Sequence, residues 1–326
     1  MDMMKRIGVL TSGGDSPGMN ACIRAIVKSS LAQGIVVVGI ADGFQGLIEG
    51  RMSELHYSSV NNIIHLGGTI LGSARSQEFL TIEGREMAIN NCKEKKLDAL
   101  IVIGGDGTYK GALQLSKESS IPVIGIPGTI DNDIASTDLT IGFDTCLNTV
   151  IQAVDKIRDT ATSHHRVFFV EVMGRHSGQI AYHAAIASGA DHVLIPETKT
   201  NMIELAQQLI SAKGVRSSIV IVAEGDDEGD AQQIVNEIKP LLPTFDIKYS
   251  KLGHIQRGGS PSASDRILAT KMGDCAVSLL VKGKFNQLAV TKNGIVTHIE
   301  LSSSAIENKD EQTENRQLLD RMLTRH

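Results

Sequence analysis

Residues 99–108 read ALIVIGGDGT, and this short stretch decides how the rest of the sequence is interpreted. The five apolar residues 99–103 are typical of a parallel strand that is buried on both faces. A glycine-rich turn, Gly104–Thr108, follows at once. Ligands of open α/β sheets bind beyond the carboxyl ends of the strands, so we predict that this turn belongs to a binding site.

The same pattern of apolar run and turn recurs on both sides of this stretch. Amphipathic segments separate the runs, and the clearest is 144–160, whose apolar residues repeat at helical spacing behind a predicted N-cap at Asp144. Alternating strands and helices indicate right-handed βαβ units and a doubly wound α/β fold with mainly parallel sheets. The other predicted strands are 7–10, 36–40, 123–126, 167–172 and 219–222.

Length and composition narrow the class of protein. The 326 residues suffice for two modest cores or one large α/β unit, and 41% apolar with 21% charged residues is typical of a soluble globular protein. The net charge of −5, the 3% aromatic content and the absence of Trp argue against nucleic-acid binding. No segment approaches the ~20 apolar residues that a membrane span needs.

The cysteines and the start of the sequence point to a reducing compartment. The four cysteines lie far apart without CxxC spacing, so we expect free thiols in a cytoplasmic protein rather than a zinc or redox site. The apolar run 7–10 is too short for a secretory signal. These cysteines are Cys22, Cys92, Cys146 and Cys275.

Asp106 stands inside the GGDGT turn, where glycines would let backbone approach a phosphate. A carboxylate there would repel an anionic ligand unless a divalent cation lay between them. We therefore interpret Asp106 as a direct or water-mediated Mg²⁺ ligand. The alternative is a turn in which Asp106 only caps a helix.

A second glycine loop, TSGGDSPGMN at 11–20, follows the predicted strand 7–10. Its glycines and the helix after it suit phosphate binding. Met19 and Asn20 occupy the positions of the Lys and Ser/Thr of a Walker A loop, so the loop belongs to another class. Taken alone, it could equally be a tight turn.

The segment PGTIDND at 127–133 places Asp131 and Asp133 two residues apart, beside Thr129. One carboxylate can take the proton of an attacking alcohol while the other supports Mg²⁺ or orients the substrate. An Asx-rich turn is the alternative. The presence of GGDGT in the same chain favours catalysis.

Two later clusters combine basic residues with glycines. They are EVMGRHSG at 171–178 and LGHIQRGGSP at 252–261. Arg175 and Arg257 suit a phosphate because a guanidinium can donate to two oxygens at once. For either cluster alone, a structural salt bridge is an equal alternative.

Together these segments closely resemble the bacterial ATP-dependent 6-phosphofructokinases. The resemblance runs from residues 7–15 to beyond Gly294 and includes GGTILGSAR at 67–75. It implies two similar Rossmann-like α/β sandwich domains and transfer of the γ-phosphoryl group of MgATP to the 1-hydroxyl of fructose 6-phosphate, the committed step of glycolysis. NAD kinases and lipid kinases also carry GGDGT, but PGTIDND and HIQRGG disfavour them. A non-catalytic nucleotide sensor would be expected to lack Asp106 or Asp131.

The resemblance implies a role for each matching position. Asp131 is the base that deprotonates the sugar, Thr129 and Arg175 stabilise the transferring phosphoryl group, and Phe44 replaces a Tyr that usually lies near adenine. The implied ATP-binding residues are Gly14, Phe44, Arg75, Ser76, Gly105, Asp106, Gly107 and Thr108, with Asp106 holding Mg²⁺. The implied sugar-phosphate residues are Thr129, Ile130, Asp131, Asp133, Arg166, Met173, Gly174, Arg175, Glu224, Lys248, His254 and Arg257.

Two of these residues imply an assembly. The family contributes the residues at Arg166 and Lys248 from a neighbouring subunit, so the resemblance implies an obligate homotetramer with a shared active site. Lys248 stands where the family usually has Arg, which keeps the charge but gives up the bidentate fork. The implied ATP-binding domain is 1–142 with 256–304, and the implied fructose 6-phosphate-binding domain is 143–255 with 305–326.

Two glycines indicate whether the phosphoryl donor is ATP or pyrophosphate. Pyrophosphate-dependent relatives typically carry Asp and Lys where this chain has Gly107 and Gly128. A side chain at Gly107 would intrude on the α-phosphate and ribose, so the two glycines favour ATP.

The family's second anion site is altered in this chain. That site binds ADP or phosphoenolpyruvate as allosteric effectors, and the usual basic residues at Tyr57, Val215 and Ser217 are lost here, while Asp191 replaces a Glu. We predict weak or absent allosteric control by these effectors. The alternative is a pocket rebuilt around neighbours such as Lys199 or Arg216 that still binds them. The matching effector positions are Arg24, Lys28, Arg158, Gly189, Asp191 and Lys213.

Overall fold

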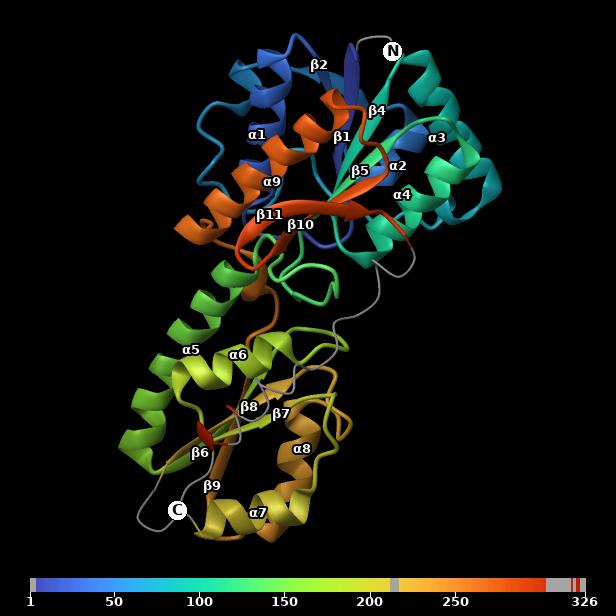
Figure 1. The fold of residues 1–326 in the computed structure, drawn as a ribbon. Coiled ribbons are helices and arrows are strands. Elements are labelled where there is room, and N and C mark those ends of the chain that lie inside the picture. The colour runs from blue at the N-terminus through green and yellow to red at the C-terminus, as the bar shows by residue number, and fades with distance from the viewer. Residues whose placement is uncertain (1–3, 212–216, 303–317, 319–320, 323–326) are drawn as a thin grey trace. The chain divides into compact units, whose positions relative to one another are not determined.

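The computed structural model describes residues 4–211, 217–302, 318 and 321–322, which fall into two compact units. The described part of the first unit lies in residues 4–130, 134–145 and 257–302. The second unit contains residues 131–133, 146–211 and 217–256 and the short C-terminal pieces. Each unit is a sheet covered by helices (Figure 1), so the predicted α/β class is confirmed.

The first unit is built on a seven-stranded sheet of order β11-β10-β5-β4-β1-β2-β3. Its five inner strands are parallel, and only the edge strands β3 and β11 run antiparallel to their neighbours. The strands are β1 (Arg6–Thr11), β2 (Val36–Ile40), β3 (Met52–Leu55), β4 (Ala99–Gly104), β5 (Val123–Pro127), β10 (Gln287–Lys292) and β11 (Ile295–Glu300).

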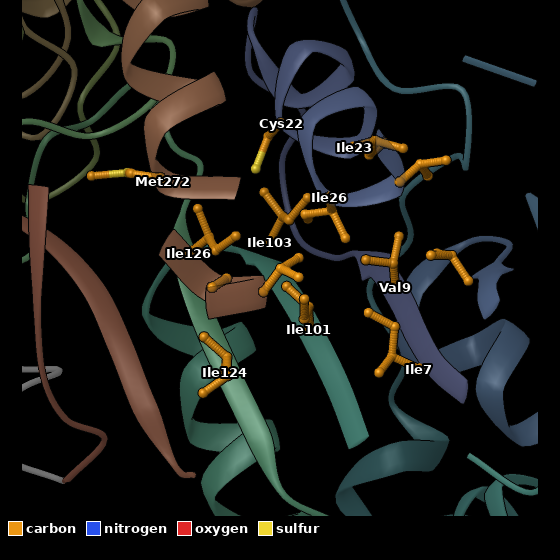
Figure 2. Packing of buried hydrophobic residues seen from close by; sticks show 14 of the residues in the cluster. Ile7, Val9, Cys22, Ile23, Ile26, Ile101, Ile103, Ile124, Ile126 and Met272 are labelled. Carbon is orange, nitrogen blue, oxygen red and sulfur yellow. The ribbon is translucent and has the colours of Figure 1, made fainter. Parts of the chain in front are cut away.

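Helices cover both faces of this sheet because successive strand residues point to opposite sides. Ile101 and Ile103 of β4 pack with Ile26 of α1 and Met272 of α9, as Figure 2 shows. Leu100 belongs to the core on the other face, beneath α2, α3 and α4. These helices are α1 (Met19–Ala32), α2 (Gly43–Glu49), α3 (Ile82–Glu94), α4 (Asp106–Glu118) and α9 (Ala263–Val281).

The second unit has a four-stranded, fully parallel sheet of order β7-β8-β6-β9. Apolar residues of β6, β8 and β9 pack against α7 and α8 on one face, and α6 packs on β8. The strands are β6 (Arg166–Val172), β7 (His192–Leu194), β8 (Ser218–Ala223) and β9 (Asp246–Lys251). The helices are α5 (Phe143–His164), whose first three residues belong to the first unit, α6 (Gln179–Ser188), α7 (Met202–Ser211) and α8 (Ala231–Ile238).

The predicted strands are confirmed as β1, β2, β4, β5, β6 and β8, and the predicted helix 144–160 as α5. The predicted N-cap is wrong, because α5 begins at Phe143 and Asp144 lies inside its first turn. The Asp144 carboxylate instead accepts a hydrogen bond from the Ser262 hydroxyl, a contact that local sequence does not reveal.

Strand register determines which loops are neighbours. In the first sheet Thr11 pairs with Ile103 and Gly104 with Pro127, so β1, β4 and β5 end side by side. In the second sheet Val172 pairs with Ala223, so β6 and β8 also end together.

In the part of the chain that the structure describes, no helix is long and apolar enough to span a membrane.

Candidate active site

The GGDGT turn connects β4 directly to α4. Gly105 is the N-cap of α4, and its carbonyl oxygen accepts hydrogen bonds from the backbone N–H groups of Thr108 (3.0 Å) and Tyr109 (3.2 Å). Asp106 is thus the first residue of the helix, where free N–H groups and the helix dipole favour an anion. Its carboxylate lies 3.1 Å from the Lys110 ammonium, one helical turn further on.

The loop after β1 lies against this turn. The Ser12 N–H donates to the Ile103 carbonyl oxygen (3.0 Å), and the Thr108 hydroxyl donates to the Ser12 carbonyl oxygen (3.1 Å). The Ser73 hydroxyl donates to the Gly13 carbonyl oxygen (2.6 Å). These contacts bring together three predicted ATP-binding segments, residues 12–18, 73–76 and 104–108, which we call the donor loops.

Two glycines of the donor loops have opposite surroundings. A Cβ at Gly107 would meet no atom within 4 Å, so open space lies over the turn. A Cβ at Gly14 would lie 2.0 Å from Nη1 of Arg257, whose guanidinium also donates to the Asp15 carbonyl oxygen (3.3 Å). The structure therefore places Arg257 in the first unit, beside the glycine loop, whereas His254 belongs to the second unit.

The predicted adenine neighbour Phe44 is buried and stacks on Phe79, with ring centroids 4.1 Å apart. The Ser76 hydroxyl accepts a hydrogen bond from the Phe79 N–H (3.1 Å) and donates to Gln45 Oε1 (2.7 Å). Arg75 is exposed. Sequence reasoning missed the stacking of Phe79 on Phe44, because no motif marks an aromatic residue whose partner lies on another element.

The segment after β5 begins in the first unit and continues in the second. The Gly128 N–H donates to the Gly104 carbonyl oxygen (2.9 Å), and the Thr129 carbonyl oxygen accepts from the Thr140 hydroxyl (2.6 Å). Asp131 is buried, and the neighbouring Asn132 has a left-handed backbone with φ 48°. A non-glycine residue in this conformation costs energy, and such residues cluster at functional sites.

Gly128 faces the core rather than open space. A Cβ at this position would lie 2.8 Å from Cγ2 of Ile103 and 3.2 Å from Cε of Met19, both of which are buried. A larger residue here would have to displace packed side chains. Of the two glycines used to predict the donor, only Gly107 lies against open space.

The predicted sugar-phosphate segments of the second unit are tied together by Gln256. Its side chain is fully buried; Oε1 accepts from the Met173 N–H (3.2 Å) and Nε2 donates to the Gly253 carbonyl oxygen (3.0 Å). Gln256 thus links the loop after β6 to the short 3₁₀ helix Gly253–Arg257 that carries His254. Sequence analysis quoted Gln256 within its motif but assigned it no role.

Arg175 is positioned through its backbone. Its φ is 54°, and its N–H donates to Glu224 Oε1 (2.9 Å). A Cβ at Gly225 would lie 1.7 Å from the Arg175 carbonyl oxygen, so only glycine allows this approach. Met173 and Gly174 precede Arg175 in the same loop, and we call residues 173–178, 224–226 and 253–256 the acceptor loops.

Arg166 and Lys248 share one carboxylate. Arg166 pairs with Asp246 across β6 and β9, its Nε lies 2.6 Å from Oδ2, and Lys248 Nζ lies 2.8 Å from Oδ1. Hydrogen bonds from Lys248 and Arg166 lower the pKa of the Asp246 carboxyl. Sequence reasoning missed Asp246, because only the pairing of strands that are far apart in the sequence brings it to Arg166.

Several predicted effector residues have structural partners. Arg158 donates to the carbonyl oxygens of Ser188 (2.8 Å) and Gly189 (3.0 Å) at the end of α6, and buried Asp191 accepts from the Ile219 N–H (2.8 Å). Lys28 lies 5.8 Å from the centroid of the Tyr57 ring. Arg24 is half-buried on α1. Lys213 and Val215 lie outside the described residues.

The GGDGT turn fits a metal-bound polyphosphate. The described residues contain no cluster of three or more His, Cys, Asp or Glu side chains suited to hold an ion. Mg²⁺ commonly binds through one or two carboxylates, phosphate oxygens and water, so Asp106 with open space over Gly107 matches that chemistry.

The described cysteines are all free thiols, and burial raises the pKa of Cys92 to about 12.

A family model described as Phosphofructokinase matches residues 6–280. The chain is 53% identical over 298 residues to the ATP-dependent 6-phosphofructokinase of Bacillus velezensis, covering 90% of this chain and 92% of that protein. It is 48% identical over 310 residues to the ATP-dependent 6-phosphofructokinase 2 of Bacteroides thetaiotaomicron, covering 94% and 95% respectively.

Solved structures agree with this comparison. The structure of phosphofructokinase from Saccharomyces cerevisiae superposes with a TM-score of 0.83 at 35% identity, covering 98% of this chain and 47% of that chain. This chain therefore spans about half the length of the yeast chain. A pyrophosphate-dependent phosphofructokinase from Nitrosospira multiformis has a TM-score of 0.88 at 21% identity, covering 98% of this chain and 91% of that one, a likeness of fold alone.

Proposed function

The chain belongs to the phosphofructokinase family, and from that premise we propose how its residues phosphorylate fructose 6-phosphate with ATP. The products are fructose 1,6-bisphosphate and ADP, and the reaction is a step of glycolysis. The observation that carries the choice of donor is the open space over Gly107, next to Asp106 at the start of α4. It leaves room for the α-phosphate and ribose of a nucleotide.

The donor loops are proposed to bind ATP in the first unit. Backbone N–H groups at the start of α4 would face the phosphates, and Gly14 and Arg75 would contribute from the neighbouring loops. Asp106 would hold Mg²⁺, exchanging its Lys110 partner for the ion. Bound Mg²⁺ neutralises charge on the phosphate oxygens as it develops during transfer.

Asp131 is proposed to act as the general base. As the sugar 1-oxygen forms its bond to the γ-phosphorus, the hydroxyl proton passes to the Asp131 carboxylate, and the bond to the ADP oxygen breaks. A positioned base contributes typically ~10²–10⁴-fold to the rate. Thr129 and Arg175 would stabilise the charge on the transferring group, and Asp133 would orient the substrate or the metal.

The acceptor loops of the second unit are proposed to bind the sugar phosphate. Met173, Gly174 and Glu224 would contact the sugar, and Ile130 would contribute its backbone. His254 would bind the 6-phosphate, and Arg257, which belongs to the first unit, would join it by exchanging the Asp15 carbonyl oxygen for a phosphate oxygen. Gln256 supports this assignment because it fixes the Met173 loop relative to the helix carrying His254.

Arg166 and Lys248 are proposed to reach the sugar phosphate bound by a neighbouring subunit in a cytoplasmic homotetramer. Both cations are partly exposed on the surface of the second unit. Each would have to exchange part of its pairing with Asp246 for a phosphate oxygen.

The test is a coupled assay of the purified chain with MgATP or magnesium pyrophosphate as donor. Acceptors are fructose 6-phosphate and its isomers glucose 6-phosphate and mannose 6-phosphate. We expect turnover with MgATP and fructose 6-phosphate, and its loss when Mg²⁺ is chelated. Turnover with pyrophosphate alone, or equal rates with all acceptors, would contradict the proposal.

A further inference from the structure

A cavity of about 500 Å³ lies in the first unit, lined by the carboxyl-terminal half of α9, by Lys284 and by the turn and strand at 294–298. Helix α9 contacts both strands of the β10–β11 hairpin, and these elements can be followed in Figure 1. None of its lining residues belongs to the donor loops, the acceptor loops or the predicted effector positions. Its size lies in the range typical of small-molecule sites, roughly 300–1,000 Å³.

The lining of this cavity is cationic although the chain as a whole carries a net charge of −5. Lys271, Lys282 and Lys284 face one acidic residue, Asp274. Asp274 Oδ1 already accepts a hydrogen bond from the Ser29 hydroxyl (2.6 Å). Lys271 lies in the body of α9, Lys282 is its C-cap and Lys284 follows two residues later, so one continuous stretch of chain supplies all three lysines.

His298 of β11 adds a fourth basic group. The Lys284 ammonium lies 3.2 Å from its Nε2 atom. An ammonium has no lone pair to offer, so Nε2 must accept the hydrogen bond and the ring must be neutral. Burial lowers the pKa of His298, and the nearby Lys284 and Lys282 lower it further.

The alternative is that these lysines are ordinary solvated surface residues. Lys271, Lys282 and Lys284 are all exposed and, like most of the described lysines and arginines, form no ion pair with a carboxylate, so pairing alone does not set them apart. The dipole at the end of α9 would account for Lys282 alone. It does not account for Lys284, whose ammonium has an imidazole as its partner.

We propose that this cavity binds a small phosphorylated molecule. Lys282 and Lys284 would donate to its phosphate oxygens, and His298 would become a second donor by taking up a proton. The buried Leu279 and the half-buried Val296 form an apolar wall that suits a non-ionic portion of the ligand. Charge-assisted hydrogen bonds of this kind are the strong ones in phosphate recognition.

Cys275 offers a readout that does not depend on catalysis. It lines the cavity and is only partly buried, whereas Cys22, Cys92 and Cys146 are buried. Alkylation of the folded protein by the neutral reagent iodoacetamide, followed by mass spectrometry of the Cys275 peptide, therefore reports on access to the cavity. The probes are inorganic pyrophosphate, which presents phosphate alone, and phenyl phosphate, which adds an apolar ring.

We expect both probes to protect Cys275 saturably, and potassium chloride at equal ionic strength not to protect it. Lys284→Gln should weaken protection about tenfold, the loss typical of one charged hydrogen bond. Lys284→Arg should retain protection, and so should Lys292→Gln, which changes an exposed lysine outside the cavity. These two variants also control for folding.

If neither probe protected Cys275 at millimolar concentration, or if only phenyl phosphate did, the proposal would be overturned. Equal protection in wild type and Lys284→Gln would overturn it as well. Protection by pyrophosphate but not by phenyl phosphate would support the phosphate contacts and overturn the role of the Leu279 and Val296 wall.

Discussion

The donor loops and the acceptor loops reach their conformations by different means. The donor loops are held by backbone hydrogen bonds and by the short hydroxyl side chains of Ser73 and Thr108, and they leave open space over Gly107. The acceptor loops depend in addition on longer side chains, namely Gln256, which accepts from the Met173 N–H, and Glu224, which accepts from the Arg175 N–H.

This difference has an energetic consequence. A polyphosphate can approach the N-terminus of α4 without displacing a side chain over Gly107. At the amino end of β6, Arg166 and Lys248 already have a carboxylate partner in Asp246, so a sugar phosphate that a neighbouring subunit binds there, as proposed, would compete with it. Donor binding should therefore be sensitive to added bulk, and acceptor binding to the balance of charge.

The largest expected effect belongs to Asp131, where the reaction itself takes place. Asp131→Ser should lower kcat by about 10²–10⁴-fold and change KM for fructose 6-phosphate only a few fold, because a base acts mainly in the transition state. Steady-state kinetics measure both constants, and Asp155→Ser, at an exposed position of α5, is the matched control. Near-normal turnover of Asp131→Ser would remove Asp131 from the mechanism.

Gly107→Asp tests the open donor side. A carboxylate in that space would crowd and repel the polyphosphate, and a repulsion of about 1–3 kcal/mol corresponds to a roughly 5–150-fold loss of kcat/KM for MgATP. Gly107→Ala adds a methyl group without charge and should lose much less. If the two variants used MgATP as well as wild type does, the nucleotide would not pass over Gly107.

Lys248→Ala tests the acceptor side. Loss of a charged hydrogen bond to phosphate, roughly 1.5–3 kcal/mol, should raise KM for fructose 6-phosphate about one to two orders of magnitude. Lys248→Arg should leave KM for fructose 6-phosphate unchanged or lower it, because a planar guanidinium can donate to two phosphate oxygens. An unchanged KM for Lys248→Ala would mean that Lys248 forms its ion pair with Asp246 and does not contact the sugar phosphate.

The variant Asp226→Asn tests whether the charge of this carboxylate in the acceptor loops destabilises the folded protein. Burial raises its pKa to about 6, above the usual value of 3.8. Between these values the folded state binds a proton that the unfolded state does not, so this contribution to stability falls as pH rises from 4 to 6 and stays low above 6. Asp226→Asn should thus raise the free energy of unfolding by about 1–3 kcal/mol at pH 8 and by little at pH 4.

Denaturant unfolding at the two pH values measures this difference. Asp155→Asn is the matched control, since Asp155 is exposed on α5 of the same unit and is not among the groups that shift the pKa of Asp226. An equal gain in stability at pH 4 and pH 8 would show that hydrogen bonding, rather than titration of Asp226, is responsible.

The smallest effect is expected from effectors. Arg158 and Asp191 have backbone partners in the second unit, and Tyr57 supplies no charge. ADP and phosphoenolpyruvate should leave the initial rate at sub-saturating fructose 6-phosphate nearly unchanged, with near-hyperbolic kinetics. A sigmoid that sub-millimolar ADP relieves would contradict this expectation.

The difference between local signals and long-range contacts explains what the sequence could predict. Continuous apolar runs marked the buried strands, and the glycines after Ile103 marked the donor turn, because both signals are local. The Asp246 and Gln256 contacts depend on strand pairing and on residues about eighty positions apart. The contact of Arg257 with Asp15 spans 242 residues, so no local pattern could place Arg257 beside the glycine loop.

The most direct test of the account is ³¹P NMR of one reaction that contains fructose 6-phosphate, Mg²⁺, and ATP and pyrophosphate in equal amounts. We predict that the γ-phosphate resonance of ATP disappears as a second sugar-phosphate ester appears in equal amount, and that pyrophosphate remains. Consumption of pyrophosphate in place of ATP, or release of inorganic phosphate without a new ester, would contradict the assignment of the donor loops and of Asp131.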